Sequence, residues 1–231
     1  MLPVGIIVFI VIYCLVLCLY FYTETSGNLK LRAPNKITLA LMFFIFGLVY
    51  AIIGMNSGIF DHGLMPLFIV ALFLSMLGDI FLLFSFSTGA HFFAAGNIAF
   101  SAFQLTLLTY YYQVSMGNLW WIFLVIPFLW AIYPVLAHIY PNKFPFGKDK
   151  SSVYFYMATI TTSGTLGLAT AIFAPHYRIM GIGLILFMLS DFDIILHKYV
   201  FPKNKWVHRL NSALYFTGLL MIVLNVAILT L

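Results

Sequence analysis

Residues 76–83 read "MLGDIFLL" and place one carboxylate, Asp79, among apolar side chains and a glycine. The apolar run continues in both directions, from about residue 63 to residue 86. An ionised Asp at the centre of a membrane helix costs about 2.5–3.5 kcal/mol on insertion scales. The stretch therefore indicates a membrane helix whose acid has a function or a buried partner.

The whole chain resembles this stretch in composition. Of its 231 residues, 64% are hydrophobic and 7% are charged, whereas soluble proteins have roughly 25% charged residues. So few charges cannot cover a surface in water, while a membrane-spanning helix needs about 20 mainly apolar residues. We therefore predict a single transmembrane domain over residues 1–231. Its first apolar run lacks a basic leader and a small-residue cleavage site, so we expect a retained helix rather than a signal peptide.

Eight apolar segments follow one another along the chain. They are longer than the roughly 9–11 residues of membrane barrel strands, and they do not alternate in polarity. We therefore predict an all-α, polytopic membrane protein with eight transmembrane helices. The segments are 3–22, 37–56, 63–86, 89–113, 118–138, 151–172, 177–198 and 206–230.

Basic residues are distributed unevenly between the connections. Ten of the 11 Lys and Arg residues lie in or beside the first, fifth and seventh connections, and only Arg178 lies in an even one. Because cytoplasmic loops are enriched in Lys and Arg, we predict that both termini are non-cytoplasmic. We expect a multi-pass protein of the cytoplasmic membrane in a bacterium, or of the endoplasmic reticulum in a eukaryote. The ten residues are Lys30, Arg32, Lys36, Lys143, Lys148, Lys150, Lys198, Lys203, Lys205 and Arg209.

Two short sequence motifs recur in the two halves of the chain. "SMLGDIF" at 75–81 and "FMLSDFD" at 187–193 share Met-Leu-x-Asp at an offset of 112, and "PNK" occurs at 34–36 and 141–143. These recurring motifs predict two four-helix repeats. An even number of helices in each makes the repeats parallel, with an axis along the membrane normal. Short apolar motifs also recur by chance, so chance similarity stays open as the alternative to a structural repeat.

Asp79 and Asp191 lie inside apolar segments at matching depth. Asp79 precedes Ser85 by six residues and Asp191 precedes Lys198 by seven, which places both roughly 10 Å inside the cytoplasmic boundary at about 1.5 Å per residue. If one pocket holds both, low dielectric and like charge favour one protonated and one ionised acid. General acid–base catalysis uses that arrangement. The alternative is that each Asp only hydrogen-bonds a neighbouring helix.

The remaining acidic residues have simpler interpretations. Glu24, Asp61 and Asp149 are expected in loops or at helix ends. Asp193 points about 200° away from Asp191 on a helix. It stands four residues before His197, so we expect a local ion pair near the interface.

The sequence motifs around the two intramembrane acids resemble those of the YhhN-like family of membrane proteins, which includes the lysoplasmalogenases. The family's Gly-Asp in the third helix corresponds to Gly78-Asp79. Its Phe-x-x-Gly-x-x-x-Phe and following polar residue in the fourth helix correspond to "FAAGNIAFSAFQ" at 93–104. Its Gly-x-x-x-Phe-x-x-Ser-Asp in the seventh helix corresponds to residues 183–191, and the Tyr of the eighth to Tyr215.

Two positions depart from the family's pattern. The family often has His where Gln104 stands, and Gln where Gly218 stands. Gln104 can hydrogen-bond but cannot carry a proton at neutral pH. Gly218 removes a polar group altogether, so the resemblance leaves rate and substrate preference open.

The resemblance implies hydrolysis of the vinyl-ether bond of a lysoplasmalogen to a fatty aldehyde and a glycerophospho-base. Such cleavage begins with protonation of the outer carbon of the double bond and leaves an oxocarbenium ion that a carboxylate stabilises. Asp79 and Asp191 are the candidate catalytic residues, with acid and base unassigned. Six residues are candidates for orienting water or the head group, with helix-to-helix hydrogen bonding as the alternative: Asn97, Gln104, Tyr154, Tyr156, Ser190 and Tyr215.

Other chemistries have less support. The six histidines lie at or near segment ends without a His-x-x-x-His pair, so no metal site is predicted. We expect no cofactor, nucleic acid or obligate protein partner, and we expect a lysophospholipid substrate and membrane lipid as partners. The competing function is a proton-coupled transporter of lipid or small solutes that uses the same aspartates. Transporters more often break their helices with Gly or Pro at mid-membrane. Pro127 is the main proline inside a predicted helix, which slightly favours the hydrolase over the transporter.

Overall fold

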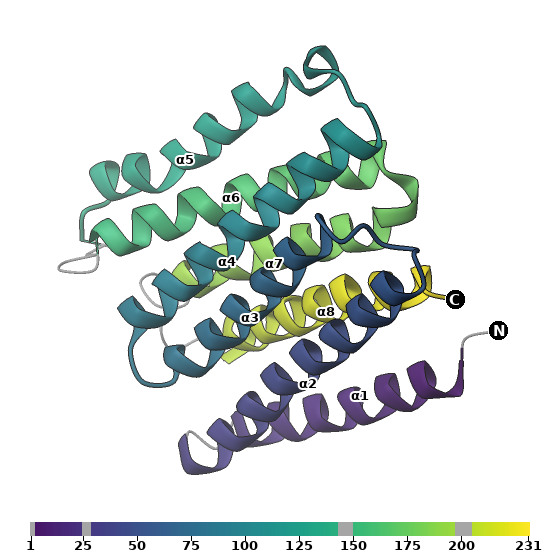
Figure 1. Cartoon of the computed structure of the whole chain (residues 1–231). Helices are drawn as coiled ribbons and strands as arrows, with labels where there is room; N and C mark the ends of the chain where they lie inside the picture. The colour runs from purple at the N-terminus through teal and green to yellow at the C-terminus, as the bar shows by residue number, and fades with distance from the viewer. Residues whose placement is uncertain (1–2, 25–28, 143–149, 197–204) are drawn as a thin grey trace.

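The computed structural model describes residues 3–24, 29–142, 150–196 and 205–231, which form a bundle of helices (Figure 1). Each predicted apolar segment contains one α-helix, and the second helix begins at Leu29 rather than at residue 37. The α-helices are α1 Val4–Glu24, α2 Leu29–Asn56, α3 Met65–Leu82, α4 Phe86–Thr106, α5 Ile122–Ile139, α6 Lys150–Phe173, α7 Arg178–Ile195 and α8 Lys205–Leu229. Shorter turns are η1 Leu107–Tyr111, η2 Met116–Leu119 and η4 Pro175–Tyr177.

Local sequence explains how the helices that carry the site begin. Pro66 stands in the first turn of α3, where its missing N–H costs no hydrogen bond. Ser85 caps α4, because its side chain accepts a hydrogen bond from the backbone N–H of Thr88 at 3.4 Å. The Ser85 cap also ends the short connection, residues 83–85, that turns α3 back into α4.

Six helices among the described residues are long and apolar enough to cross a membrane: α1, α2, α3, α4 extended through η1, η2 joined to α5, and α8. The all-α fold is therefore confirmed, and the chain is compatible with a multi-pass membrane protein. Of the eight predicted spans, α6 and α7 do not meet the requirement. The 18 residues of α7 include Arg178, Asp191 and Asp193, and α6 is rich in Ser and Thr.

The position of α6 and α7 accounts for their polarity. α6 packs against α4, α5 and α7, and α7 packs against α6 and α8, so neither has to present a wholly apolar surface to lipid. The hydroxyls of Thr161 and Thr165 donate to backbone carbonyls one turn earlier in the same helix, each at 2.7 Å. Those hydrogen bonds satisfy the hydroxyls without water.

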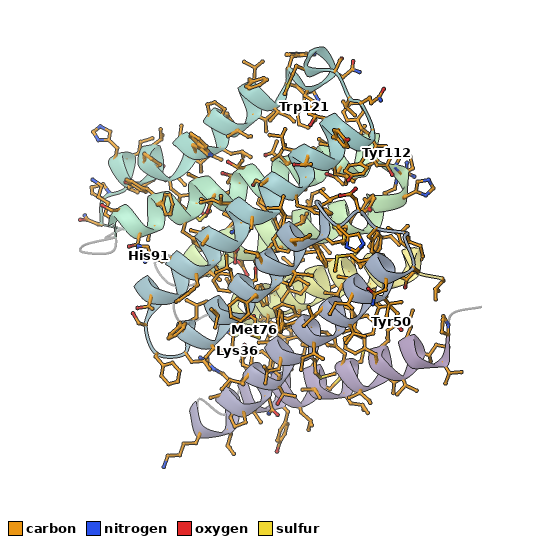
Figure 2. All side chains as sticks on the ribbon, viewed as in Figure 1. Lys36, Tyr50, Met76, His91, Tyr112 and Trp121 are labelled. Atoms are coloured by element: carbon orange, nitrogen blue, oxygen red, sulfur yellow. The ribbon has the colours of Figure 1, made fainter. Side chains whose placement is uncertain are left out.

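α1 and α5 lie at opposite edges of the bundle (Figure 1). Their outer faces carry apolar side chains, including Leu15 at 60% exposure and Phe128 at 70% exposure, and carbon-rich side chains cover the outside of the bundle (Figure 2). Such an exterior suits a lipid environment. α1 begins and α8 ends at the same end of the bundle (Figure 1), as expected for an even number of helices that alternate in direction.

Helix pairs recur in the two halves of the chain. α1 packs on α2 as α5 packs on α6, α2 on α3 as α6 on α7, and α3 on α4 as α7 on α8. The contact between α4 and α6 likewise has its counterpart between α8 and α2. A parallel repeat of helices α1–α4 and α5–α8 predicts this pattern.

α7 and α8 meet through two glycines. A Cβ added to Gly218 would lie 2.7 Å from the carbonyl oxygen of Gly183, and a Cβ added to Gly183 would lie 2.7 Å from the carbonyl oxygen of Gly218. The two backbones therefore touch, as small residues permit in membrane helices. This crossing has no room for the Gln that the family often has at Gly218.

We expect Gly218→Ala to lower the unfolding temperature of the purified protein in detergent. The new methyl group would have to separate two backbones, and overpacking of this kind costs about 1–3 kcal/mol. Gly5→Ala is the matched control, since a Cβ there meets only the Tyr50 hydroxyl at 4.0 Å. Equal unfolding temperatures for the two variants would contradict the close crossing.

Candidate active site

Asp79 belongs to the buried stripe of α3, in line with Phe68, Leu72 and Ser75. Its side chain is 1% exposed. The preceding Gly78 leaves space for Phe93 of α4, whose ring atoms would lie 2.8 Å from an added Cβ. The Gly78-Asp79 motif therefore brings the Phe93 ring of α4 close to the Asp79 carboxylate.

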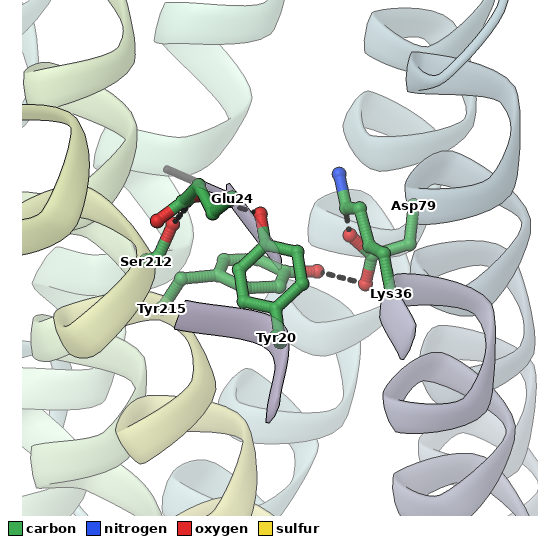
Figure 3. A network of polar contacts seen from close by, with 6 residues as sticks. All are labelled: Tyr20, Glu24, Lys36, Asp79, Ser212 and Tyr215. Atoms are coloured by element: carbon green, nitrogen blue, oxygen red, sulfur yellow. Dashed lines mark hydrogen bonds and ion pairs between the residues drawn. The ribbon is translucent and has the colours of Figure 1, made fainter. Parts of the chain in front are cut away.

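The Asp79 carboxylate has one partner for each oxygen (Figure 3). The Lys36 ammonium of α2 lies 3.3 Å from Oδ1. The Tyr215 hydroxyl of α8 donates a hydrogen bond to Oδ2. The side chain of Lys36 is 15% exposed, so the ion pair is largely removed from solvent. A carboxylate held by a cation and a hydroxyl is stabilised in its ionised form.

A small cavity opens beside Asp79. Its volume of about 30 Å³ is enough for a water molecule, because one probe sphere occupies roughly 10–15 Å³. Polar groups and aromatic rings line it together, as a bound water requires. The lining includes Tyr20, Lys36, Asp79, Phe93, Ser212 and Tyr215.

Asp191 belongs to the buried stripe of α7, in line with Met180, Leu184 and Phe187, and it is 0% exposed. Neither of its carboxylate oxygens has a hydrogen-bond partner among the described residues. The Tyr156 hydroxyl of α6 lies beside it without a hydrogen bond of ordinary geometry. The surroundings of Asp191 therefore differ from those of Asp79.

Aromatic rings connect the two acids. Phe93 contacts both tyrosines, with ring centroids 6.1 Å from Tyr156 and 6.1 Å from Tyr215. Phe187 packs on Phe93 at 6.0 Å and on Tyr215 at 5.2 Å. The carboxylates of Asp79 and Asp191 are close enough to interact electrostatically. The structure thus brings both predicted acids, Tyr156 and Tyr215 into one core.

Asn97 lies on the same face of α4 as Phe93, one turn further on. It is 0% exposed, and neither atom of its amide has a hydrogen-bond partner among the described residues. A buried amide without partners calls for an explanation, such as water or a ligand. Asn97 therefore stays a candidate for the substrate site.

Three predicted site residues make other contacts. Gln104 donates to the Ser163 carbonyl at 3.2 Å and accepts from Thr170 at 3.4 Å, so it joins α4 to α6. The Ser190 hydroxyl donates to the Phe187 carbonyl of its own helix at 2.7 Å. The ammonium of Lys150 lies over the ring of Tyr154. No described contact brings these three side chains to either acid.

Sequence reasoning missed several polar residues near Asp79. Lys36 was expected only as a cytoplasmic charge, and Glu24 only as a helix end. Instead Glu24 is 7% exposed, and its Oε1 accepts hydrogen bonds from Tyr20 at 2.8 Å and Ser212 at 2.7 Å (Figure 3). Glu24 does end α1, as expected, but its burial and its two hydrogen bonds were not anticipated. His197, the expected partner of Asp193, lies outside the described residues.

Helical bundle and site together define the class: a protein with apolar helices suited to a membrane and two buried carboxylates in its core. The chain belongs to the YhhN family, whose sequence profile matches residues 36–226. No curated protein and no solved structure matches the chain. The matched range begins at Lys36 and includes both carboxylates, whereas Tyr20 and Glu24 precede it.

The two tyrosines allow a matched test of the geometry. We expect Tyr215→Phe to destabilise the protein by about 1.5–3 kcal/mol, the range for a hydrogen bond to a charged group. Tyr156→Phe removes a hydroxyl without a hydrogen-bond partner among the described residues, so we expect little change. Thermal unfolding in detergent measures both variants. A larger loss for Tyr156→Phe would contradict the arrangement.

Proposed function

We propose that this protein hydrolyses the vinyl-ether bond of lysoplasmalogens, releasing a fatty aldehyde and a glycerophospho-base. One observation carries the proposal: the core of a YhhN family member buries two interacting carboxylates in unlike surroundings. Asp79 is paired with a cation and accepts a hydrogen bond from a hydroxyl. Asp191 has no ion pair among the described residues, and the Tyr156 hydroxyl lies beside it without a hydrogen bond of ordinary geometry. Such a difference would decide which of two like residues serves as the acid and which as the base.

The surroundings support a role for each acid. A charge buried without partners is costly, so the Asp191 carboxyl is best accommodated as a neutral, protonated group and acts as the general acid. The Asp79 carboxylate is compensated by Lys36. It stabilises the cationic intermediate and accepts a proton from water.

The reaction then proceeds in balanced steps. Asp191 donates its proton to the outer carbon of the double bond, which makes the inner carbon an oxocarbenium centre. A water molecule in the cavity beside Asp79 adds to that carbon while Asp79 takes its proton, and a hemiacetal results. Asp79 passes this proton to the glycerol oxygen as the carbon–oxygen bond breaks. The hemiacetal hydroxyl returns its proton to Asp191, and the aldehyde leaves.

Helix packing also supports the finer topology. We infer that α6 and α7 cross the membrane with the other six helices, because they run through the same bundle (Figure 1). Lys150 is the first residue of α6, and Lys30 is the second residue of α2. Both helices start at the same end of the bundle (Figure 1), and we assign that end to the cytoplasm. The recurring helix pairs support a parallel repeat that places α3 and α7 in equivalent positions.

The geometry gives transport less support. Transporters commonly place broken helices at their binding sites, whereas α3 and α7 run unbroken through Asp79 and Asp191. α5 contains two prolines, Pro127 and Pro134, but it continues as one helix through both and lies at the edge of the bundle. The same purified protein in sealed vesicles, assayed for proton-dependent uptake, distinguishes the two functions.

We expect the purified protein to release fatty aldehyde from a lysoplasmalogen. Asp79→Asn and Asp191→Asn should each lower the rate by about 10²–10⁴-fold, the usual contribution of a general acid or base. Asp61→Asn is the control, since it removes an exposed carboxylate from the connection between α2 and α3. Its aldehyde release should equal that of the parent.

Each result bears on a separate part of the proposal. Release that persists in either core variant would refute the paired-acid mechanism. A folded parent that releases no aldehyde would refute the hydrolase. Circular dichroism and gel filtration establish that the Asn variants fold.

Single cysteines test the eight-span topology. In a background with Cys14→Ala and Cys18→Ala, we expect Asn142→Cys and His176→Cys to react with an impermeant thiol reagent from opposite sides of the membrane. The two positions are exposed and flank α6, which makes their sidedness a direct readout of its crossing. Labelling of both from the same side would show that α6 does not span.

A further inference from the structure

Lys36 differs in placement from a basic residue that only marks the cytoplasmic side. Such residues extend toward lipid head groups and water, but Lys36 turns inward and pairs with Asp79. It lies on α2 at the level of Met76 of α3 (Figure 2), and it lines the cavity with Tyr20 and Ser212. A cation therefore stands inside the candidate site, near the start of α2.

Arg32 supplies a second cation on the same side of α2. It precedes Lys36 by four residues, so the two side chains share one helix face. Arg32 interacts electrostatically with Tyr20, which lines the cavity. Its Nε is buried without a hydrogen-bond partner among the described residues. Two positive groups thus lie one turn apart near the start of α2, and Lys36 is the one that lines the cavity.

A single group of a lysophospholipid matches this end of the site. Its phosphodiester carries a negative charge and is separated from the ether oxygen by only the glycerol carbons and one oxygen. Lys and Arg are the residues that bind phosphate in proteins, with Lys acting as a point charge on a flexible stem. A substrate whose vinyl ether reaches the acids therefore brings its phosphate toward the start of α2.

We propose, on the basis of the proposed function, that Lys36 and Arg32 form the phosphate subsite, and that the substrate's phosphodiester draws Lys36 away from Asp79. The Lys36–Asp79 contact is one oxygen at 3.3 Å, and Tyr215 continues to hold Oδ2 after the exchange. Asp79 is then free to accept a proton from water. Lys36 thereby makes the site selective for ether lipids that carry a phosphate and couples substrate binding to the state of the base.

Binding of lipids that cannot be hydrolysed tests the subsite directly. The probes are a tritiated 1-O-alkyl-lysophosphocholine and a tritiated 1-O-alkylglycerol, which have the chain but no vinyl ether, and only the first has a phosphate. We expect the parent in nanodiscs to bind the phosphate lipid about 10- to 100-fold more tightly, the range that a hydrogen bond to a charged group supplies. Lys36→Gln should remove most of this preference and leave the affinity for alkylglycerol unchanged.

Matched variants separate charge from folding and position. Lys30→Gln removes the same charge from an exposed position on α2 and should bind both lipids as the parent does. Lys36→Arg keeps the charge and should retain part of the preference. If Lys36→Gln does not fold, Arg32→Gln provides the same comparison of the two lipids. An equal loss for both lipids, or no loss for the phosphate lipid, overturns the proposal.

The binding assay and the aldehyde assay can fail independently. Phosphate-selective binding that depends on Lys36, without aldehyde release by the parent, would keep the subsite and remove the hydrolase. Aldehyde release by a parent that binds both lipids equally would keep the hydrolase and remove the subsite.

Discussion

A carboxylate buried among apolar helices has to be compensated where it stands, because removing an ion from water costs several kcal/mol. Asp79 of α3 obtains that compensation from Lys36 of α2 and Tyr215 of α8. One ion pair and one hydrogen bond thereby connect three helices. Apolar packing alone specifies helix positions weakly in a bilayer, since lipid tails are as apolar as the side chains. The polar core of this protein supplies the specificity that its apolar surfaces lack.

Α-helices and both acids could be predicted from sequence because their signals are local. A long apolar run indicates a helix, and a charge within it stands out against its neighbours. Lys36 and Glu24 could not be identified in this way, since both lie near segment ends, where a charge is inexpensive in either orientation. Whether such a side chain turns inward depends on contacts with other helices. The spacing of the residues in α1 does give one signal for Glu24. Ile6, Tyr13 and Tyr20 recur every seven residues on the buried face of α1, and Glu24 lies on the same face one turn after Tyr20.

Polar residues inside the helices were harder to assign than the acids. Gln104 and Asn97 both lie on α4 and are fully buried, and nothing in their spacing distinguishes them. The structure does distinguish them, since Gln104 joins α4 to α6 and Asn97 has no hydrogen bond from its amide among the described residues. An amide can satisfy itself on any neighbouring backbone carbonyl. Its role is therefore decided by the partner helix, which no local pattern encodes.

The two halves of the chain pack alike, but they do not surround their acids alike. Asp79 and Asp191 occupy matching places on α3 and α7, yet α2 presents Lys36 to the first, while α6 presents Tyr156 to the second. At the offset of 112 residues that relates the acids, Tyr156 corresponds to Phe44. Two carboxyls in identical surroundings can share one proton, but neither would be preferred as the acid or as the base. Both carboxyl groups lie in one core, and their unlike neighbours suit them to the separate roles that the proposed reaction gives them.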